Sequence, residues 1–443
     1  MMAITNRHRR LANEADSLLG AGNSGRSCHQ PASNDESPDP SRRSRYIFHA
    51  VRVASFFSTI YVLLIFVPLG ILSRALGWHP VSISIFNFLA IIPLSALVSY
   101  SADRLSNYVG ELVGGLIHAT FGNAVELIVG TLALSHGETR FVQSAMLGSI
   151  LSDILLVLGV CLFFAACGKQ APKFNKAMVD SLSSLMVITA AALILPTALY
   201  STFSSSKSSK IGDKILTFSR ASAIVLFILY AMYLYFQLGT HPHLFLNSPT
   251  DESVTTGERD SENAAEEQQV PALGLHSASI ILITATLGIM VCTHYFIDSV
   301  DETAKALHIT KTFIAAVLIP IASNAPEFAS VVAASRSGKI NFAIGVIVGS
   351  ILQIGLFVIP FLVTLGWIIQ QPMTLYFEMF QTSILFFAVL VVNRLIQEGK
   401  YTYIQGAMLV GLYAIIAIAF YTCPEVSEDT VRKRSVYMIT TEV

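Results

Sequence analysis

Two glutamates inside strongly apolar stretches are the residues best suited to chemistry in this sequence. Glu126 and Glu327 each follow an asparagine by three residues, so the amides of Asn123 and Asn324 share a helix face with the carboxylates. An ionised carboxylate in an apolar helix is costly unless it faces a partner or a wet cavity. Carboxylate and amide oxygens suit a hard divalent cation, and two acids held close together also take up a proton readily, because like charges oppose full ionisation. The pair therefore predicts a site where a divalent cation and protons compete, which is the minimal chemistry of an antiporter.

An internal repeat places the two glutamates at equivalent positions. When the chain is slid along itself until Asn123 meets Asn324, Glu126 meets Glu327 and several small residues also match. These further matches are Ala124 with Ala325, Gly137 with Gly338, Phe141 with Phe342, and Gly148-Ser149-Ile150-Leu151 with Gly349-Ser350-Ile351-Leu352. Apolar helices match by chance at Leu, Ile and Val, but rarely at Asn, Glu and Gly-Ser in one register. A purely structural role, in which neutral or paired acids lock helices together, would have to hold twice, so the repeat favours an ion site.

Neighbouring residues supply further candidate ligands. Gly122 and Pro326 lie close to the glutamates and weaken the helices, which lets backbone carbonyls turn toward an ion in a cavity. The two Gly-Ser pairs permit close helix approach and add hydroxyl groups, although helix packing alone also explains them. The candidate metal-ligand set is Glu126, Glu327, Asn123, Asn324, Ser149, Ser350, Gln353, Ser152 and Asp153.

Membrane-spanning helices are the elements that must position these residues. The chain has 443 residues, of which 53% are hydrophobic and only 13% charged, against roughly 25% charged residues in a soluble protein. Apolar runs long enough for a bilayer core lie at residues 53–72, 83–100, 112–134, 142–166, 178–200, 222–238, 278–297, 313–334, 342–369, 375–392 and 404–422. They predict an all-α integral membrane protein of about eleven transmembrane helices.

The repeat also predicts the topology. The matched segments are the third and eighth predicted helices, then the fourth and ninth, so an odd number of helices separates each pair. The second half is therefore inverted relative to the first, as in many transporters that build alternating access around a central ion site. We predict a leading transmembrane helix within residues 46–76, followed by two inverted five-helix repeats at 77–246 and 272–423.

Polar segments make up the rest of the chain. Residues 1–45 are too poor in apolar side chains to repay ordering and are predicted to be disordered, and the arginines before the first helix favour a cytoplasmic N-terminus. Residues 247–271 carry a run of acids and form a cytoplasmic linker between the repeats, either a flexible tether or a calcium-sensing or gating element. Residues 424–443 form a C-terminal tail.

Several function classes receive no support. A formal net charge of −1 gives no reason to expect a nucleic-acid partner, and the five cysteines form no CxxC pair. No nucleophile with a base and no metal triad is visible, so an enzyme is not expected. The expected partners are the lipid bilayer, transported cations and protons, and further copies of the chain are possible. Asp298, Asp301 and Glu302, at the end of the seventh predicted helix, form either an ion-access vestibule or a solvated helix end.

The paired motifs resemble a known family. HATFGNAVELIVG, from His118 to Gly130, followed by MLGSILSDILLVLG, resembles the first repeat of the vacuolar-type calcium/proton exchangers. IPIASNAPEFASVV followed by AIGVIVGSILQIGLFVIP resembles the second, and the resemblance spans nearly the whole chain after residue 45. It implies an extra first helix before two inverted five-helix repeats, and a proton gradient that loads calcium into a vacuole or other acidic endomembrane compartment, with no cofactor. By that resemblance Glu126 and Glu327 alternate between calcium and protons, and the site is lined by Asn123, Asn324, Ser149, Ser350 and Gln353.

The second repeat departs from the family pattern. The family reads GNAAEH where this chain has Ser323-Asn324-Ala325-Pro326-Glu327-Phe328, so a titratable histidine is replaced by Phe328. In the first repeat, His118 and Asp153 stand where the family has asparagines. We hypothesise that His118 and Asp153 partly replace the lost histidine in proton handling, or shift selectivity away from calcium. The alternatives are a sodium-coupled exchanger, suggested by the Pro-Glu pair, an exchanger for manganese or another divalent ion, and a non-transporting sensor or scaffold.

Overall fold

The computed structural model describes most of the apolar part of the chain. Described are residues 62–109, 120–167, 176–203, 211–240, 274–397 and 401–422, together with Gly114 and Ile117. The predicted N-terminal tail (1–45), acidic linker (247–271) and C-terminal tail (424–443) lie outside the described residues, as do His118 and the first part of the predicted leading helix.

The described residues are helical and contain no strand, which confirms the predicted all-α membrane fold. Eight helices are long and apolar enough to cross a bilayer, or nine when a bent pair counts as one span. Two shorter apolar helices occupy the remaining predicted positions, η1 with α3 (Leu63–Ala75) and α6 (Ala124–Ser135). Both adjoin residues outside the described part of the chain, so the count of eleven remains a prediction.

The spans follow one another in the predicted order. Along the chain they are α4 (Pro80–Val109), α7 (Thr139–Leu151) with η2 (Ser152–Val157) and α8 (Leu158–Ala166), α9 (Lys176–Phe203), α10 (Ile211–Leu234) with η3 (Tyr235–Thr240), α12 (Leu275–Leu307), the bent pair, α16 (Ile340–Gln353) with η7 (Ile354–Val358) and α17 (Ile359–Ile368), α18 (Met379–Gln397) and α19 (Tyr403–Thr422). The bent pair is α13 (Lys311–Phe313), η6 (Ile314–Leu318) and α14 (Ile319–Ser323), followed by α15 (Ala325–Arg336) at an angle of 50°.

Several helices extend beyond the predicted apolar runs, and two of the differences change the setting of polar groups. The seventh helix, α12, continues ten residues beyond the apolar run and ends at Leu307, so Asp298 and Asp301 lie within a helix rather than at its end. The tenth helix, α18, begins at Met379, because the stretch before it is buried and non-helical. There the backbone N–H of Leu375 donates to Ser219 Oγ and that of Phe377 donates to Thr197 Oγ1, each at 3.0 Å. Side chains from neighbouring helices thus satisfy donors that a helix would otherwise pair internally.

The backbone repeats itself at the positions that the sequence matches. α6 and α15 each have 12 residues and each begins directly after an asparagine, Asn123 or Asn324. Gly137 and Gly338, with φ values of 81° and 83°, end these helices in equivalent left-handed turns, a conformation that glycine adopts without steric cost. The next span of each half then contains a π-helical segment, η2 or η7, and the two begin one position apart in the repeat register. The sequence repeat is therefore a repeat of backbone geometry.

Both asparagines interrupt a helix. Asn123 has φ −106° and ψ 28°, and Asn324 has φ −82° and ψ 3°, outside the helical region in both cases. Pro326 is compatible with the first turn of α15 because it lacks only a donor that the turn leaves unused. The expected weakening of these helices is confirmed. Its consequence is that Glu126 and Glu327 fall in the first turn of a new helix, where the helix dipole favours negative charge.

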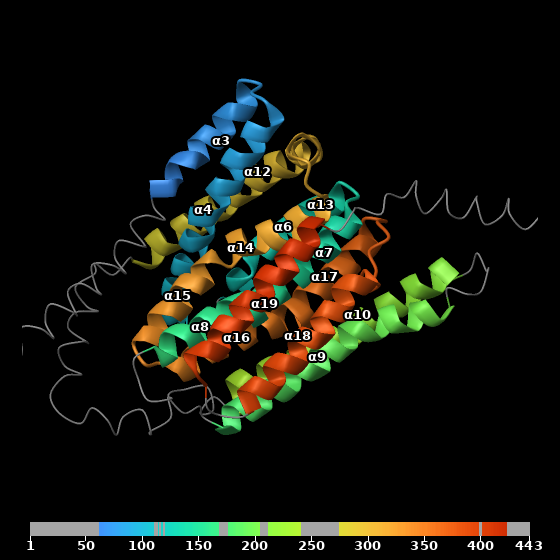
Figure 1. Cartoon of the computed structure of the whole chain (residues 1–443). Coiled ribbons are helices and arrows are strands. Elements are labelled where there is room, and N and C mark those ends of the chain that lie inside the picture. The colour runs from blue at the N-terminus through green and yellow to red at the C-terminus, as the bar shows by residue number, and fades with distance from the viewer. Residues whose placement is uncertain are drawn as a thin grey trace, which may run out of the picture. The chain divides into compact units, whose positions relative to one another are not determined.

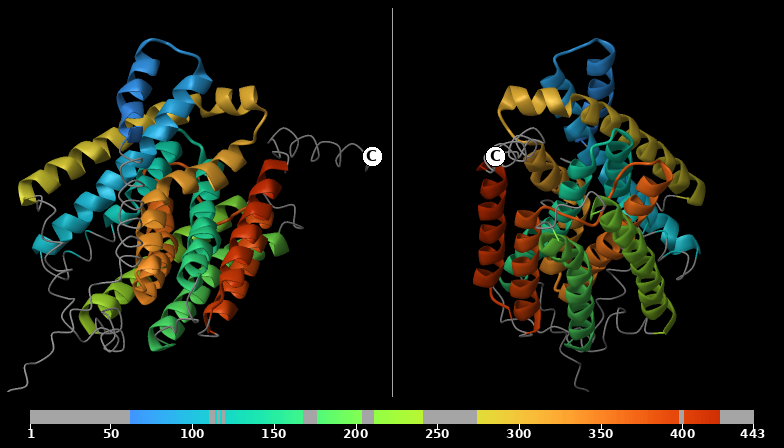
Figure 2. Two further views of the ribbon diagram at one scale, coloured as in Figure 1. Left: turned by 60° about the vertical axis from the view of Figure 1, so that its left-hand side comes forward. Right: turned by 90° about the vertical axis from the view of Figure 1, so that its right-hand side faces the viewer.

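The two spans with π-helical segments form the centre of the bundle. In each of them 78% of the most apolar stretch is buried, compared with 22% for the span that contains α10. α6 packs against α17 and α15 packs against α8, so each short helix contacts the opposite half (Figure 1). α4 and α12 pack along one another with α3 beside them, whereas α18 and α19 lie across the bundle, where they pack on α9 and α8 (Figure 2). Each broken helix thus packs against both central spans.

Candidate functional site

Asn123 joins the first broken helix to the second central span. Its Nδ2 donates to Gln353 Oε1 at 2.7 Å, and its Oδ1 accepts from Ser350 Oγ at 3.3 Å. All three side chains are buried. The amide is therefore oriented by two partners that lie more than two hundred residues away in the sequence.

Asn324 makes the reciprocal connection to the first central span. Its Nδ2 donates to Asp153 Oδ1 at 2.7 Å and to the Ser149 carbonyl at 3.4 Å. Its Oδ1 lies 3.2 Å from Ser149 Oγ and 3.3 Å from Ser323 Oγ, both of which can donate. Each asparagine thus reaches the Gly-Ser segment of the other half, as a pseudo-twofold arrangement requires.

The match between the two halves is shifted by one residue at Asp153. In the sequence register Gln353 matches Ser152, yet in space Asp153 takes the place opposite Asn324 that Gln353 takes opposite Asn123. The π-helical segment begins at Ser152 in one half but at Ile354, one position later, in the other. The wider turn therefore brings a different residue to face the asparagine, and that residue is an acid only in the first half.

Three carboxylates converge at this meeting point. Glu126 is 3% exposed, and its Oε1 accepts from Ser149 Oγ at 3.1 Å. Asp153 is fully buried, and its negative charge interacts with those of Glu126 and Glu327. Glu327 is only partly buried. Because the hydrogen bonds described for Glu126 and Asp153 come from neutral hydroxyl and amide groups, they offset little of the cost of burying ionised acids together.

Several buried polar atoms of the site have no hydrogen-bond partner in the described part of the chain, among them Ser152 Oγ, Gln353 Nε2 and one oxygen of Asp153. Asp153 Oδ2 makes no hydrogen bond within the described residues, although Oδ1 of the same carboxylate is held by Asn324. A buried polar atom without a partner is costly, and a bound cation or a proton would remove that cost. The geometry thus leaves a carboxylate oxygen available between the two halves.

The structure brings together the predicted ligand set. Hydrogen bonds link seven of its residues into two groups, one of Asn123, Ser350 and Gln353 and one of Glu126, Ser149, Asp153 and Asn324. Glu327 interacts with the second group through the charge of Asp153, and Ser152 is buried beside Asp153. The proton-handling candidate His118 lies outside the described residues. Phe328, at the position of the missing histidine, is partly buried and packs against the apolar core.

Two residues of the site were missed. Ser323 donates to Asn324 and lies within reach of Glu126, and it occupies the place of a glycine in the family pattern, which was the available signal. Tyr413, on α19, is 5% exposed, and its hydroxyl lies near Ser152 and Asp153. A tyrosine in an apolar run two hundred and sixty residues away gives no sequence signal of that contact.

Comparison with known proteins fits this geometry. The family described as sodium/calcium exchanger protein matches residues 79–239 and 277–422, well over half of the chain. The chain belongs to the sodium/calcium exchanger protein family. Within it, the chain is 38% identical over 376 residues to the vacuolar calcium ion transporter of Schizosaccharomyces pombe, covering 85% of this chain and 87% of that one. The resemblance to vacuolar-type exchangers is confirmed.

Bacterial members of the exchanger family are similar too. The Ca2+/H+ antiporter of Synechocystis sp. is 34% identical over 367 residues, which cover 82% of this chain and 97% of that protein. Among solved structures, the Ca2+/H+ antiporter YfkE is similar with a TM-score of 0.68 and 26% identity, covering 83% of this chain and 100% of that chain. The exchanger fold therefore accounts for nearly the whole described structure.

Proposed function

We propose that this protein is a secondary active antiporter that exchanges calcium for protons across a vacuolar or other acidic endomembrane, and so removes calcium from the cytosol. The observation that carries the proposal is the convergence of Glu126, Asp153 and Glu327 where the two repeats exchange Asn–Ser hydrogen bonds. The printed names of the relatives, a vacuolar calcium ion transporter and Ca2+/H+ antiporters, support the choice of ions.

The available oxygens suit calcium. Ca2+ takes six to eight oxygen ligands in flexible geometry. The site offers three carboxylates, three side-chain amide oxygens and several hydroxyls, from Glu126, Asp153, Glu327, Asn123, Asn324, Gln353, Ser149, Ser152 and Ser350. The donor set contains no thiolate or imidazole, the ligands that softer transition metals prefer.

Coupling follows from the cost of burial. Without a cation, ionised acids held together in an apolar bundle repel one another, so the empty site takes up protons. Calcium binds only when the acids are ionised, so protons must leave first. If the protein changes conformation only when calcium or protons occupy the site, it exchanges calcium for protons.

The acceptor of the Ser149 hydroxyl proton depends on whether Glu126 is ionised or protonated. It lies within hydrogen-bond distance of Glu126 Oε1 and of Asn324 Oδ1, but it has one proton and donates to one of them at a time. An ionised Glu126 accepts that proton, whereas a protonated Glu126 becomes a donor to Ser149 and releases the hydroxyl proton toward Asn324. Protonation in one half thus changes a hydrogen bond to the other half.

Alternating access would use the breaks at the asparagines. α6 and α15 begin at non-helical residues, so each can change its angle without breaking a continuous helix. Glu126 is buried while Glu327 is partly exposed, which is the asymmetry expected when a site opens to one side only. The equivalent backbones of the halves provide the opposite state, with the roles of the two glutamates exchanged.

The test is radioactive calcium uptake into sealed vesicles that contain the purified protein and an acidic interior. We expect uptake that requires the pH gradient, collapses with a protonophore and disappears in Glu327→Gln. Glu302→Gln, which changes an exposed acid on α12, is the matched control and should transport normally. Uptake driven by internal sodium rather than by protons would place the protein in a sodium-coupled branch. If folded protein transported none of the ions tested, the proposed transport function would be wrong.

A further inference from the structure

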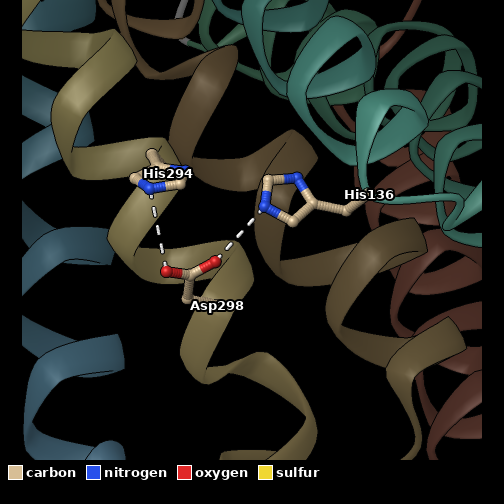
Figure 3. A group of neighbouring side chains, drawn as sticks. All are labelled: His136, His294 and Asp298. Carbon is tan, nitrogen blue, oxygen red and sulfur yellow. Dashed lines mark ion pairs between the residues drawn. The ribbon is translucent and has the colours of Figure 1, made fainter.

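A second cation-binding geometry lies outside the carboxylate site. His136 caps the C-terminal end of α6, while His294 and Asp298 lie one turn apart on α12 (Figure 3). His136 Nε2 is 3.3 Å from Asp298 Oδ1, and His294 Nε2 is 3.7 Å from Asp298 Oδ2. One ligand atom from each residue lies within 4.8 Å of the others. Two imidazoles from two helices therefore point at opposite oxygens of one carboxylate.

The tautomer of His136 makes this arrangement informative. Its Nδ1 lies 2.8 Å from the carbonyl oxygen of Leu132, which can only accept, so Nδ1 carries the hydrogen. A neutral His136 then presents the lone pair of Nε2 to a carboxylate oxygen at 3.3 Å. Two electron-rich atoms at that separation repel unless a cation, either a proton on Nε2 or a metal ion, lies between them. A backbone carbonyl that fixes the outer nitrogen is also the usual support of a metal-ligating histidine.

We propose that His136, His294 and Asp298 bind a transition-metal dication of the zinc class. Two imidazole nitrogens and one carboxylate oxygen form the donor set of many three-ligand zinc sites, which leave a fourth position for water. Ligands about 2.0–2.1 Å from a tetrahedral ion lie roughly 3.3–3.5 Å apart. The two histidine–Asp298 separations are close to this value, and the three ligand atoms, all within 4.8 Å of one another, need a small closing movement to hold one ion. All three side chains are partly exposed, so an ion can reach them from water. Calcium, which prefers oxygen ligands, is a poor occupant.

Arg74 limits the affinity of this site. Its guanidinium lies 3.6 Å from Asp298 Oδ2, so it competes with a metal ion for the same oxygen. The arginine side chain is half exposed and comes from the last turn of α3, a third helix. It can therefore swing away when an ion binds, and its removal should strengthen binding.

A bound ion would also bear on transport, an extension that rests on the proposed function. α6 carries Glu126 at its N-terminal end and His136 at its C-terminal end, so a metal that joins His136 to α12 ties down a helix whose angle must change. We expect the occupied site to slow calcium exchange without touching the carboxylates.

The test uses cobalt(II), which replaces zinc and absorbs visible light in a site with nitrogen ligands. The purified full-length protein, in lipid nanodiscs with excess calcium to fill the carboxylate site, is titrated with cobalt and then with zinc. We expect about one cobalt per chain, displaced by zinc. His136→Ala and His294→Ala should weaken cobalt binding at least tenfold, Arg74→Gln should strengthen it, and His276→Ala, an exposed histidine elsewhere on α12, should leave it unchanged.

Calcium uptake by the same samples separates the two proposals. If protein that transports calcium shows no cobalt absorption, or if both cluster variants bind cobalt like the wild type, the metal site is refuted and the transport function stands. If cobalt binds as expected in protein that moves no calcium, the site stands and the transport proposal fails. The cluster variants should keep calcium uptake without zinc, which shows that they fold, and should lose its inhibition by zinc.

Discussion

The two halves of the carboxylate site have equivalent backbone geometry but differ in their charged residues. Each has a helix broken at an asparagine, a glutamate in the first turn that follows, a Gly-Ser pair and a π-helical segment. The residue facing the opposite asparagine is Asp153 in the first half and the neutral Gln353 in the second. The repeat thus fixes where oxygens can be placed, while single substitutions decide how many protons and cation charges the site can hold.

The halves also differ in the strength of the hydrogen bond that each asparagine makes to the other half. The Asn123–Gln353 link joins two neutral amides, whereas the Asn324–Asp153 link is assisted by a charge whenever the acid is ionised, which makes it the stronger of the two. Glu126 lies beneath the surface and Glu327 is partly exposed. A symmetric scaffold therefore supports an asymmetric resting state, and substitutions matched between the halves can test each difference.

The largest effect is expected where the halves are alike. Glu126→Gln and Glu327→Gln should each reduce calcium uptake by roughly a hundredfold or more, because either change removes both a calcium ligand and a proton carrier. Initial uptake rates in vesicles, normalised to folded protein, measure the effect. Glu302→Gln serves as the control, as above. If one glutamine variant kept most of the wild-type rate, the pseudo-twofold site would be wrong.

Packing should distinguish the two Gly-Ser pairs. A Cβ at Gly148 would lie 2.2 Å from the backbone oxygen of Ala316, so Gly148→Ala must push α7 away from η6. We expect a loss of about 1–3 kcal/mol and a lower melting temperature. A Cβ at Gly349 would meet Tyr233 Oη at 3.9 Å, an ordinary contact, so Gly349→Ala should be nearly neutral.

Thermal unfolding of the two glycine variants in the same detergent measures this difference. Residue 115, which matches Ala316 in the repeat, lies outside the described residues. Equal destabilisation by both substitutions would mean that residue 115 packs on Gly349 as closely as Ala316 packs on Gly148. The halves would then be more symmetric in packing than in charge.

Much of the architecture could be predicted from the sequence because its informative residues are rare in apolar helices. Asn, Glu and Gly-Ser in one register identified the repeat, and Gly122 and Pro326 pointed to the broken helices. The pairing of Asp153 with Asn324 could not be predicted, since it depends on a π-helical turn with no compositional signature. The contact of Tyr413 with the site depends on the packing of a distant helix.

The acids on α12 show the same limit. Asp298, expected at the end of its helix, lies inside a longer one and pairs with Arg74, His136 and His294, while its place in an ion-access vestibule stays a prediction. Asp301 pairs with Lys311, which also binds Glu138 at 3.0 Å. Apart from His294, four residues earlier on α12, these partners come from three other segments, so local sequence could show that the acids are polar but not most of what they contact.

Asp153, the extra acid of the first half, should affect the number of protons exchanged for each calcium ion. If Asp153 carries a proton along with the two glutamates, Asp153→Asn removes one proton from each exchange cycle. At zero membrane potential, the calcium gradient supported by each pH unit should then fall tenfold, which corresponds to about 1.4 kcal/mol. Equilibrium calcium accumulation in vesicles clamped at several pH gradients gives the ratio directly. An unchanged slope in an active variant would make Asp153 a ligand or a positioning residue and leave the proton count to the glutamates.

The smallest expected difference concerns two tyrosines near the central spans. The Tyr413 hydroxyl lies beside Ser152 and Asp153, whereas the Tyr233 hydroxyl lies near Gly349, and among the described residues no acid acts on it. Tyr413→Phe removes a polar neighbour of Asp153 and should change the apparent calcium affinity by about two- to tenfold, which corresponds to about 0.4–1.4 kcal/mol. Tyr233→Phe, with the same loss of one hydroxyl, should leave that affinity unchanged. Calcium dependence of the uptake rate measures both, and equal responses would show that the tyrosines act through helix packing rather than through the extra acid that distinguishes the first half.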